Sequence, residues 1–339
     1  MVYQIEVTQP IGDVTQRHTP LLTRERALVL GKVAITFALL ALLATRIDRG
    51  AVAQSIAHAH PAGLILAVAI LFLSYPLGGL RWWCVLKGLG QSSPMRLLIG
   101  LFWIGGLFSQ VLPNPLGDAL RVSIATRRGI QLTAALRSAV FERMIMVIAL
   151  LLLVAATEPL LHAAVGDAAP VWLAWVLLAM ALSGLVLLLA ADLLVALAPA
   201  LPLVRALGGW SADFRRLTSS KWSIPVYATS LLAHLNLIAS AALIGWSLDL
   251  PLTALDYLAI MPVATVAMVI PISVGGWGVR EGVLIAVLGA MGVSFAAALT
   301  FSLLFGAAIA LSSLPALALF WLRGPVAADR ARLDVRGQF

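Results

Sequence analysis

Two short segments of the sequence place an arginine shortly after a run of helix-breaking residues. In the first, Pro113 is followed by a glycine-bearing turn and then by Arg121, and in the second, Pro271 is followed by a glycine-rich turn and then by Arg280. Because proline and glycine end helices, each segment predicts a broken helix whose second half starts near the arginine. The free N–H groups of a helix start attract anions, and the guanidinium fork suits phosphate. The two segments therefore predict an anion site.

The positions of proline, glycine and aspartate predict where the turn lies in each segment. We expect Pro115 and Gly117 to stop the incoming helix of the first segment, and Asp118 to cap a new helix that begins near Ala119. The second segment repeats this pattern with three glycines in its turn. The residues predicted to form the anion site and its surroundings are Asn114, Gly117, Asp118, Arg121, Glu142, Arg143, Ser273, Gly275, Gly276, Gly278, Arg280 and Glu281.

A charged pair, Glu142 and Arg143, lies just inside another apolar stretch. Charges within a membrane are costly unless they are paired, and they mark transport pathways. We name Arg121 as the expected partner of Glu142. A structural role is the alternative: the arginines of the two segments would sit at the lipid headgroup level, or Arg121 and Arg280 would pair with Glu142 and Glu281. The structural and functional roles are compatible.

Two other features of the sequence are interpreted as structural. Arg81, followed by two tryptophans, closes an apolar stretch and is typical of an anchor in the membrane interface. The single cysteine, Cys84, allows no intrachain disulfide and no cysteine-based zinc site, and we expect it to be buried.

The amino-acid composition indicates that the elements carrying these residues lie in a membrane. Of the 339 residues, 61% are hydrophobic and only 11% are charged, against about 25% charged in an average globular protein. Such a chain is solvated mainly by lipid, which excludes soluble enzymes, secreted disulfide scaffolds and disordered regulators. The net charge of +8 does not indicate nucleic acid, because the basic residues are spread between the apolar runs.

Apolar stretches long enough to cross a bilayer, at about 20 helical residues each, predict an all-α integral membrane protein. Six of them are expected to span, near 27–45, 61–80, 138–156, 170–191, 224–247 and 297–322. Two further stretches, near 96–126 and 257–291, are interrupted by the breaking residues described above. A plain count of hydrophobic peaks would give eight helices or more.

The distribution of positive charge predicts the orientation. The connections at 157–169 and 248–256 contain acids and no lysine or arginine, so they belong outside, whereas the basic connections stay in the cytoplasm. The segments 81–96 and 121–137 are both basic, so the stretch 96–120 between them must enter the membrane and return to the cytoplasm. The later stretch 257–291 leaves the outside and must return there before the last span, so it dips in from outside. We therefore predict six full spans and two opposed re-entrant hairpins in an inverted repeat. Its transmembrane domain covers 27–322, between cytoplasmic tails at 1–26 and 323–339.

Motifs of common enzymes are missing from the sequence. It has no G-x-x-x-x-G-K-[ST] loop, no H-E-x-x-H and no G-x-S-x-G, so neither ATP hydrolysis nor metal-assisted or serine hydrolysis is expected. We predict neither a cofactor nor a metal, and a transporter in place of an enzyme.

Five segments form a recognisable set of motifs: 81–86, 108–113, 117–121, 141–143 and 271–282, of which the last, P-x-S-x-G-G-x-G-x-R-E-G, is the most specific. Together they resemble the lysylphosphatidylglycerol synthase transmembrane-region family of flippase-like proteins. The resemblance extends over roughly 28–322. The first turn departs from the family's usual G-G-D, with one glycine fewer and an extra proline, Pro115.

The resemblance implies that the chain moves, or helps to move, phospholipids or lipid-linked molecules between leaflets. Members are either fused to a cytoplasmic aminoacyl-transferase domain or stand alone, and we expect a stand-alone member that synthesises no aminoacylated lipid. Stand-alone relatives are associated with hopanoid, glycolipid or polyprenyl-linked pathways.

The sequence thus predicts a lipid flippase or scramblase of a bacterial inner membrane, with both termini cytoplasmic and the headgroup held between two hairpin tips. Its partner is a membrane lipid, not nucleic acid, and a homo-oligomer is compatible with the sequence. Two alternatives are a membrane-embedded lipid-modifying enzyme with Glu142 as its base, and a non-catalytic partner that docks such an enzyme through the basic 192–223 loop.

Overall fold

The computed structural model of the chain describes residues 49–112, 114–166, 171–191, 202–269 and 277–323, together with positions 34, 45 and 195. The described residues form helices and no strands, which confirms the predicted all-α class. The helices are α2 (Arg49–His58), α3 (Pro61–Phe72), α4 (Ser74–Gly88), α5 (Met95–Val111), α6 (Asn114–Arg127), α7 (Leu132–Val165), α8 (Val171–Leu189), α10 (Pro202–Thr218), α11 (Ser223–Ser247), α12 (Ala254–Val269), α13 (Val279–Ala290), α14 (Phe295–Ser313) and α15 (Ala316–Arg323).

Four helices in the described part of the chain are long and apolar enough to cross a membrane. They are Pro61–Gly88, which joins α3 and α4, Leu132–Val165 (α7), Ser223–Ser247 (α11), and Phe295–Leu319, which joins α14 and part of α15. They confirm four of the predicted spans. The stretch predicted at 170–191 forms the shorter apolar helix α8. The span predicted at 27–45 lies outside the described residues apart from its positions 34 and 45, and so do both predicted tails apart from Arg323.

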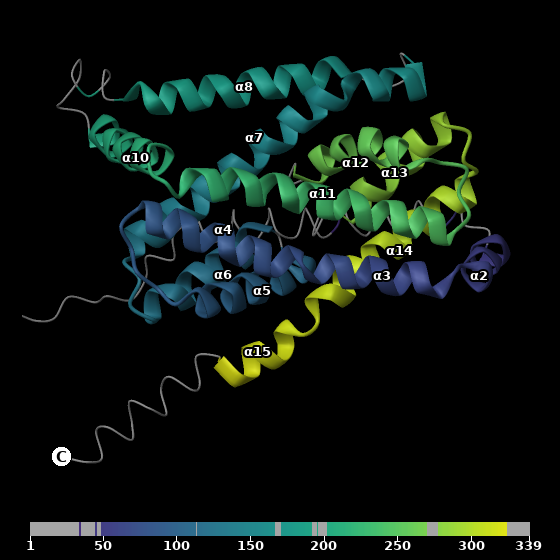
Figure 1. Ribbon diagram of the computed structural model, residues 1–339, viewed down its shortest axis with the longest axis horizontal. Helices are drawn as coiled ribbons and strands as arrows, with labels where there is room; N and C mark the ends of the chain where they lie inside the picture. Colours follow the sequence, from purple (N-terminus) through teal and green to yellow (C-terminus); the bar gives the residue numbers. More distant parts are fainter. Residues whose placement is uncertain are drawn as a thin grey trace, which may run out of the picture.

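The two interrupted stretches form pairs of shorter helices. The pair α5 and α6 covers 95–127 and the pair α12 and α13 covers 254–290, close to the predicted hairpins. In the first half α4 packs on α5, α5 on α6 and α6 on α7, and in the second half α11 packs on α12, α12 on α13 and α13 on α14. The order of span, hairpin and span therefore occurs twice, as the internal repeat of the sequence predicts. Figure 1 shows the helices α3, α4, α8 and α11 lying roughly along the long axis of the molecule.

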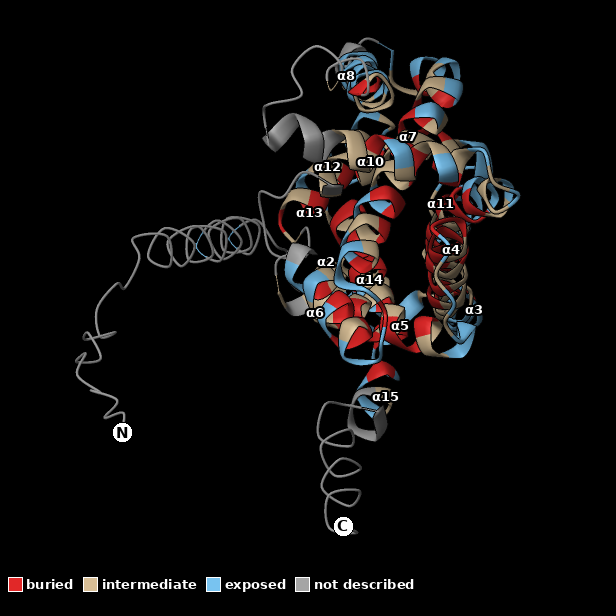
Figure 2. Ribbon diagram, turned by 90° about the vertical axis from the view of Figure 1, so that its left-hand side faces the viewer, coloured by how far each residue is buried: buried red, intermediate tan, exposed pale blue. Residues whose placement is uncertain are grey.

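Helix α10 differs from the other helices because it runs across one end of the bundle. Figure 2 looks onto that end, where α4 and α11 are seen end-on. The buried side of α10 carries Phe214 and Leu217, and the Phe214 ring meets Phe141 of α7 edge-on with 5.0 Å between centroids. An ion pair between Arg137 of α7 and Asp213 adds a polar contact. This helix therefore holds the ends of α4 and α7 together.

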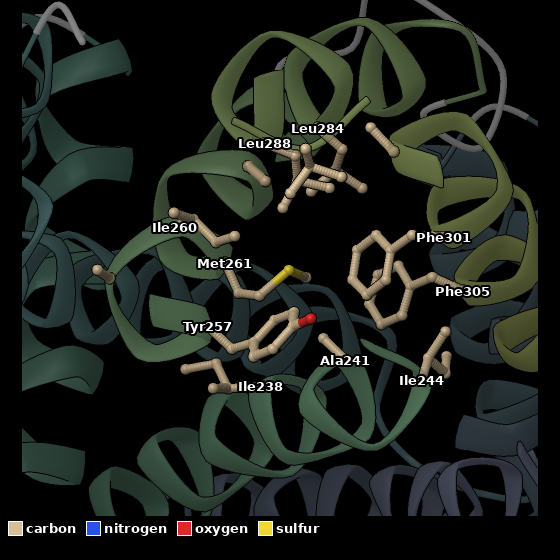
Figure 3. Packing of buried hydrophobic residues seen from close by; sticks show 14 of the residues in the cluster. Ile238, Ala241, Ile244, Tyr257, Ile260, Met261, Leu284, Leu288, Phe301 and Phe305 are labelled. Atoms are coloured by element: carbon tan, nitrogen blue, oxygen red, sulfur yellow. The ribbon is translucent and has the colours of Figure 1, made fainter. Parts of the chain in front are cut away.

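The apolar core is largest in the second half of the chain. Figure 3 shows side chains of α11, α12, α13 and α14 meeting in it, with the stacked pair Phe301 and Phe305 on the right and Leu284 and Leu288 at the top. In the first half, smaller apolar clusters surround α4, α5 and α7. Buried charged residues lie between these smaller clusters, and they make up the candidate site.

Close contact between α4 and α5 depends on Gly79. A Cβ atom at this position would lie 2.4 Å from the backbone Cα of Ile99, which cannot move without shifting α5. Small residues allow such close helix contacts in membranes, where apolar burial gives little driving force. We therefore expect Gly79→Ala to lower the free energy of unfolding by about 1–3 kcal/mol.

Thermal unfolding in detergent measures this loss. Gly184→Ala on α8 is the matched control, because a Cβ there meets nothing within 4 Å. The control should melt at or slightly above the temperature of the wild type, since alanine favours helix. Equal melting temperatures for the two variants would contradict the prediction.

Candidate anion site at the first hairpin

Three helices bring three charged side chains together inside the bundle. Arg81 comes from α4, Arg121 from α6 and Glu142 from α7, and each is at most 3% exposed. Arg81 lies near the end of its span and Glu142 near the start of its own, at the same end of the bundle. The packing of α4 and α6 against α7 therefore determines the contacts of these side chains.

One carboxylate bridges the two buried guanidinium groups. Glu142 Oε1 accepts hydrogen bonds from Arg81 Nε at 3.2 Å and from Arg81 Nη2 at 2.8 Å. Its other oxygen, Oε2, accepts from Arg121 Nη2 at 2.7 Å. Charge-assisted bonds of this kind are the strong ones. The predicted Arg121–Glu142 pair is therefore confirmed.

A second carboxylate extends the network toward the outside of the bundle. Asp118 Oδ1 accepts from Arg121 Nε at 2.9 Å, and Asp118 Oδ2 accepts from Arg143 Nη2. The Asp118 side chain is 26% exposed and that of Arg143 is 52% exposed, in contrast to the buried residues behind them. We call the set of Arg81, Asp118, Arg121, Glu142 and Arg143 the guanidinium cluster.

The guanidinium cluster has an excess of positive charge and buried donors without acceptors. Its three arginines face two carboxylates, and the Nη1 atoms of Arg81 and Arg121 are buried with no hydrogen-bond partner in the described part of the chain. A buried charged donor left without an acceptor is costly. An anion placed at these atoms would supply both the missing acceptor and the missing negative charge.

Aromatic rings fix the two buried guanidinium groups. The Arg121 guanidinium lies 4.5 Å from the ring centre of Trp82 and 4.9 Å from that of Phe102. Arg81 lies over the same Phe102 ring at 5.7 Å. Cation–π contact favours the charged form in an apolar surrounding and limits rotation of the side chain. The donors are therefore held in place for a ligand.

The structure corrects the predicted turn of the first hairpin. Helix α6 begins at Asn114, so Asp118 lies inside the helix and binds Arg121, and the expected cap at Asp118 is wrong. Pro115 is tolerated in the first turn because its missing N–H would have had no partner there. Gly117 serves the contact of α6 with α5, because a Cβ there would lie 2.5 Å from Gly105 O.

The interpretation of Arg81 as an interfacial anchor is also wrong. Its side chain is buried and bound to Glu142, and the neighbouring Trp82 is fully buried, with its indole N–H donating to Ser138 Oγ at 2.8 Å. Sequence reasoning missed this residue because an arginine before two tryptophans is typical of a membrane boundary. The apolar residues that continue after Arg81 as far as Leu86 were the signal of burial. Cys84, in contrast, is buried as predicted.

The second hairpin carries a separate ion pair. Gly278, with φ of 86°, precedes α13, and its N–H donates to Glu281 Oε2 at 2.5 Å. Arg280 Nε donates to Glu281 Oε1 at 3.0 Å, and the guanidinium lies 4.4 Å from the Trp277 ring centre. Both charged residues are at most 1% exposed.

The prediction that a helix starts at each arginine is wrong for the first segment, because Arg121 is the eighth residue of α6. Arg280 lies in the first turn of α13, as predicted, and its acid is the next residue in the chain. Its Nη2 would clash with a Cβ at Gly306 of α14, so the arginine packs closely on that helix. Ser273, Gly275 and Gly276 lie outside the described residues.

Comparison with known proteins identifies the family. Residues 29–316 match the family described as the lysylphosphatidylglycerol synthase TM region. The chain belongs to this family. The match includes both hairpins and every residue of the guanidinium cluster, so the family assignment covers the whole candidate site. It also agrees with the resemblance inferred from the sequence motifs.

A curated relative matches a smaller part of this family member. Glycosyltransferase AglD of Haloferax volcanii is 32% identical over 125 residues, which cover 37% of this chain and 20% of the relative. The chain thus matches about a fifth of that relative's length. Among the described residues, no group of three or more histidine, cysteine or acidic side chains could hold a metal ion.

Proposed function

We propose that this protein translocates a phospholipid or a lipid-linked molecule across the bacterial inner membrane, with the anionic headgroup bound at the guanidinium cluster. The observation that carries the proposal is the pair of buried Nη1 atoms on Arg81 and Arg121 that lack acceptors, in a cluster with one excess positive charge. Membership of a family named for a lipid synthase supports a lipid as the ligand.

The proposed cycle uses the two halves of the chain as an inverted repeat. The α5–α6 and α12–α13 hairpins enter the membrane from opposite sides without crossing it, and rocking of one half against the other exposes the cluster to each leaflet in turn. The acyl chains stay in lipid while the phosphate passes Arg143 and reaches Arg121 and Arg81. Equilibration of a lipid between leaflets in this way needs no energy source. Both termini are cytoplasmic in this proposal.

Lipid translocation in proteoliposomes tests the proposal. The purified protein should speed the exchange of a fluorescent anionic phospholipid between leaflets above the rate in protein-free vesicles, and Arg81→Gln should lower that rate by about tenfold. This is the effect expected from losing one hydrogen bond to a charged group. Lys87→Gln on the same helix is the control, because Lys87 lies over the Trp83 ring at 5.5 Å, away from Glu142. Equal rates in protein-containing and protein-free vesicles would reject the proposal.

A second candidate follows from the relative named as a glycosyltransferase. In this alternative the chain is a membrane-embedded lipid-modifying enzyme, or a membrane partner of one, docked through the basic residues of α10 and its flanking loop. Affinity purification from native membranes, followed by mass spectrometry of proteins and lipids, distinguishes the two. A stoichiometric enzyme partner or a modified lipid product, with no translocation by the isolated chain, would favour the second candidate.

A further inference from the structure

The two carboxylates of the guanidinium cluster differ in where they lie. The Glu142 side chain is only 4% exposed and receives hydrogen bonds from both buried arginines. Asp118 is 26% exposed, and it binds one buried arginine, Arg121, and one exposed arginine, Arg143. Glu142 is therefore the deeper of the two carboxylates, and Asp118 lies between Glu142 and the surface of the bundle.

The position of Asp118 places it where an incoming anion would first meet the site. Arg143 is the most exposed member of the cluster, at 52%, and its guanidinium is bound to Asp118. Arg121 Nε, at 2.9 Å from Asp118, is also occupied by this carboxylate. A phosphate that moved from Arg143 to Arg121 would approach the negative charge of Asp118 and compete with it for both guanidinium groups.

We propose that Asp118 is a built-in competitor of the ligand. In the empty site it substitutes for the headgroup phosphate on Arg121 and Arg143, and it helps to expel the phosphate when the cycle ends. Glu142 has no such role, because it bridges the two buried arginines and offsets part of their charge. A transport site must bind its ligand well enough to load it and weakly enough to release it. The inference rests on the proposed function and names the residue that sets ligand affinity at that site.

Binding measurements on Asp118→Asn test this inference. The probe is a short-chain phosphatidylglycerol, added to the full chain in detergent and followed by isothermal titration calorimetry. Removal of one competing charge should lower the dissociation constant by about tenfold. The same variant should release ligand more slowly, so lipid translocation should slow although binding is tighter.

Two further variants separate charge from disturbance of the fold. Asp118→Glu keeps the negative charge and should keep the affinity within about twofold of the wild type. Asp213→Asn removes a carboxylate from the Arg137 pair on α7, outside the cluster, and should leave the affinity unchanged. Glycerophosphoglycerol, the same headgroup without acyl chains, is the second probe. If Asp118→Asn binds both probes more tightly, Asp118 competes with the phosphate whether or not acyl chains are attached. If it binds only the lipid more tightly, Asp118 competes with the phosphate of a lipid and not with a free phosphate ester.

The outcomes distinguish this inference from the proposed function. If the wild type binds the lipid, and Asp118→Asn binds it equally well or more weakly, Asp118 is a structural partner of Arg121 and the inference is wrong. If neither binds either probe, the proposed function fails and the inference fails with it. Tighter binding by Asp213→Asn as well would make the effect a general response to net charge and would also overturn the inference.

Discussion

Replacement of Arg121 by alanine should lower the rate of lipid translocation by about a hundredfold. This residue is the only one that contacts both carboxylates of the cluster, through Nε to Asp118 and Nη2 to Glu142. It also supplies one of the two buried donors that await an acceptor. Hydrogen bonds to charged groups contribute about 1.5–3 kcal/mol each, and a loss of about 1.4 kcal/mol corresponds to a tenfold change.

The translocation assay in proteoliposomes measures the effect, and two variants control it. Arg127→Ala removes an exposed arginine from the last turn of the same helix and should transport at the wild-type rate. Arg121→Lys keeps the charge but cannot form the fork that contacts both acids, so we expect an intermediate rate. Because Glu142 keeps Arg81 as a partner, Arg121→Ala should still fold and insert. Unchanged translocation by correctly folded Arg121→Ala would remove this residue from the mechanism.

Loss of Glu142 should affect stability more than any other change in the cluster. Glu142→Ala leaves Arg81 and Arg121 buried with no carboxylate between them, and only Asp118 remains to contact Arg121. Removal of one partner from a buried ion pair is known to cost about 3–5 kcal/mol, because it leaves an uncompensated charge in the interior. We therefore expect a large fall in the free energy of unfolding, together with loss of translocation.

Thermal unfolding in detergent, with monodispersity monitored by size exclusion, measures this fall. Glu158→Ala on the same helix is the matched control, since Glu158 lies nearer the opposite end of α7. A double variant, Arg81→Met with Glu142→Met, should regain stability over Glu142→Ala, because it removes one buried charge together with its partner. If Glu142→Ala melts like Glu158→Ala, the Glu142 carboxylate does not stabilise the two buried arginines.

The fold was predictable where composition and periodicity determine it. The apolar runs predict the spans at 61–80, 138–156, 224–247 and 297–322, and the structure forms helices over each of them. The hairpins follow from the same breakers, yet the turn of the first one was misplaced. Proline stops a helix in its interior and fits in its first turn, and the sequence alone does not distinguish these positions for Pro115.

The site was predictable only in part, because its contacts join distant segments. The Arg121–Glu142 pair was predicted from the cost of a lone charge in a membrane. Arg81 was missed because its partner is 61 residues away, and no spacing rule connects two spans that pack side by side. The role of Asp118 was missed because its side chain binds Arg121 and Arg143 in place of the backbone it was expected to cap.

The two hairpins differ in whether their charged partners can move together. In the guanidinium cluster the partners belong to α4, α6 and α7, so any sliding of these helices past one another must break an ion pair. In the second hairpin Arg280 and Glu281 are neighbours on α13 and pair with each other, and Gly306 of α14 lies against the Arg280 guanidinium. Sliding of α13 against its neighbours would therefore leave the Arg280–Glu281 pair intact, whereas sliding of α6 against α7 would break the pair of Arg121 and Glu142.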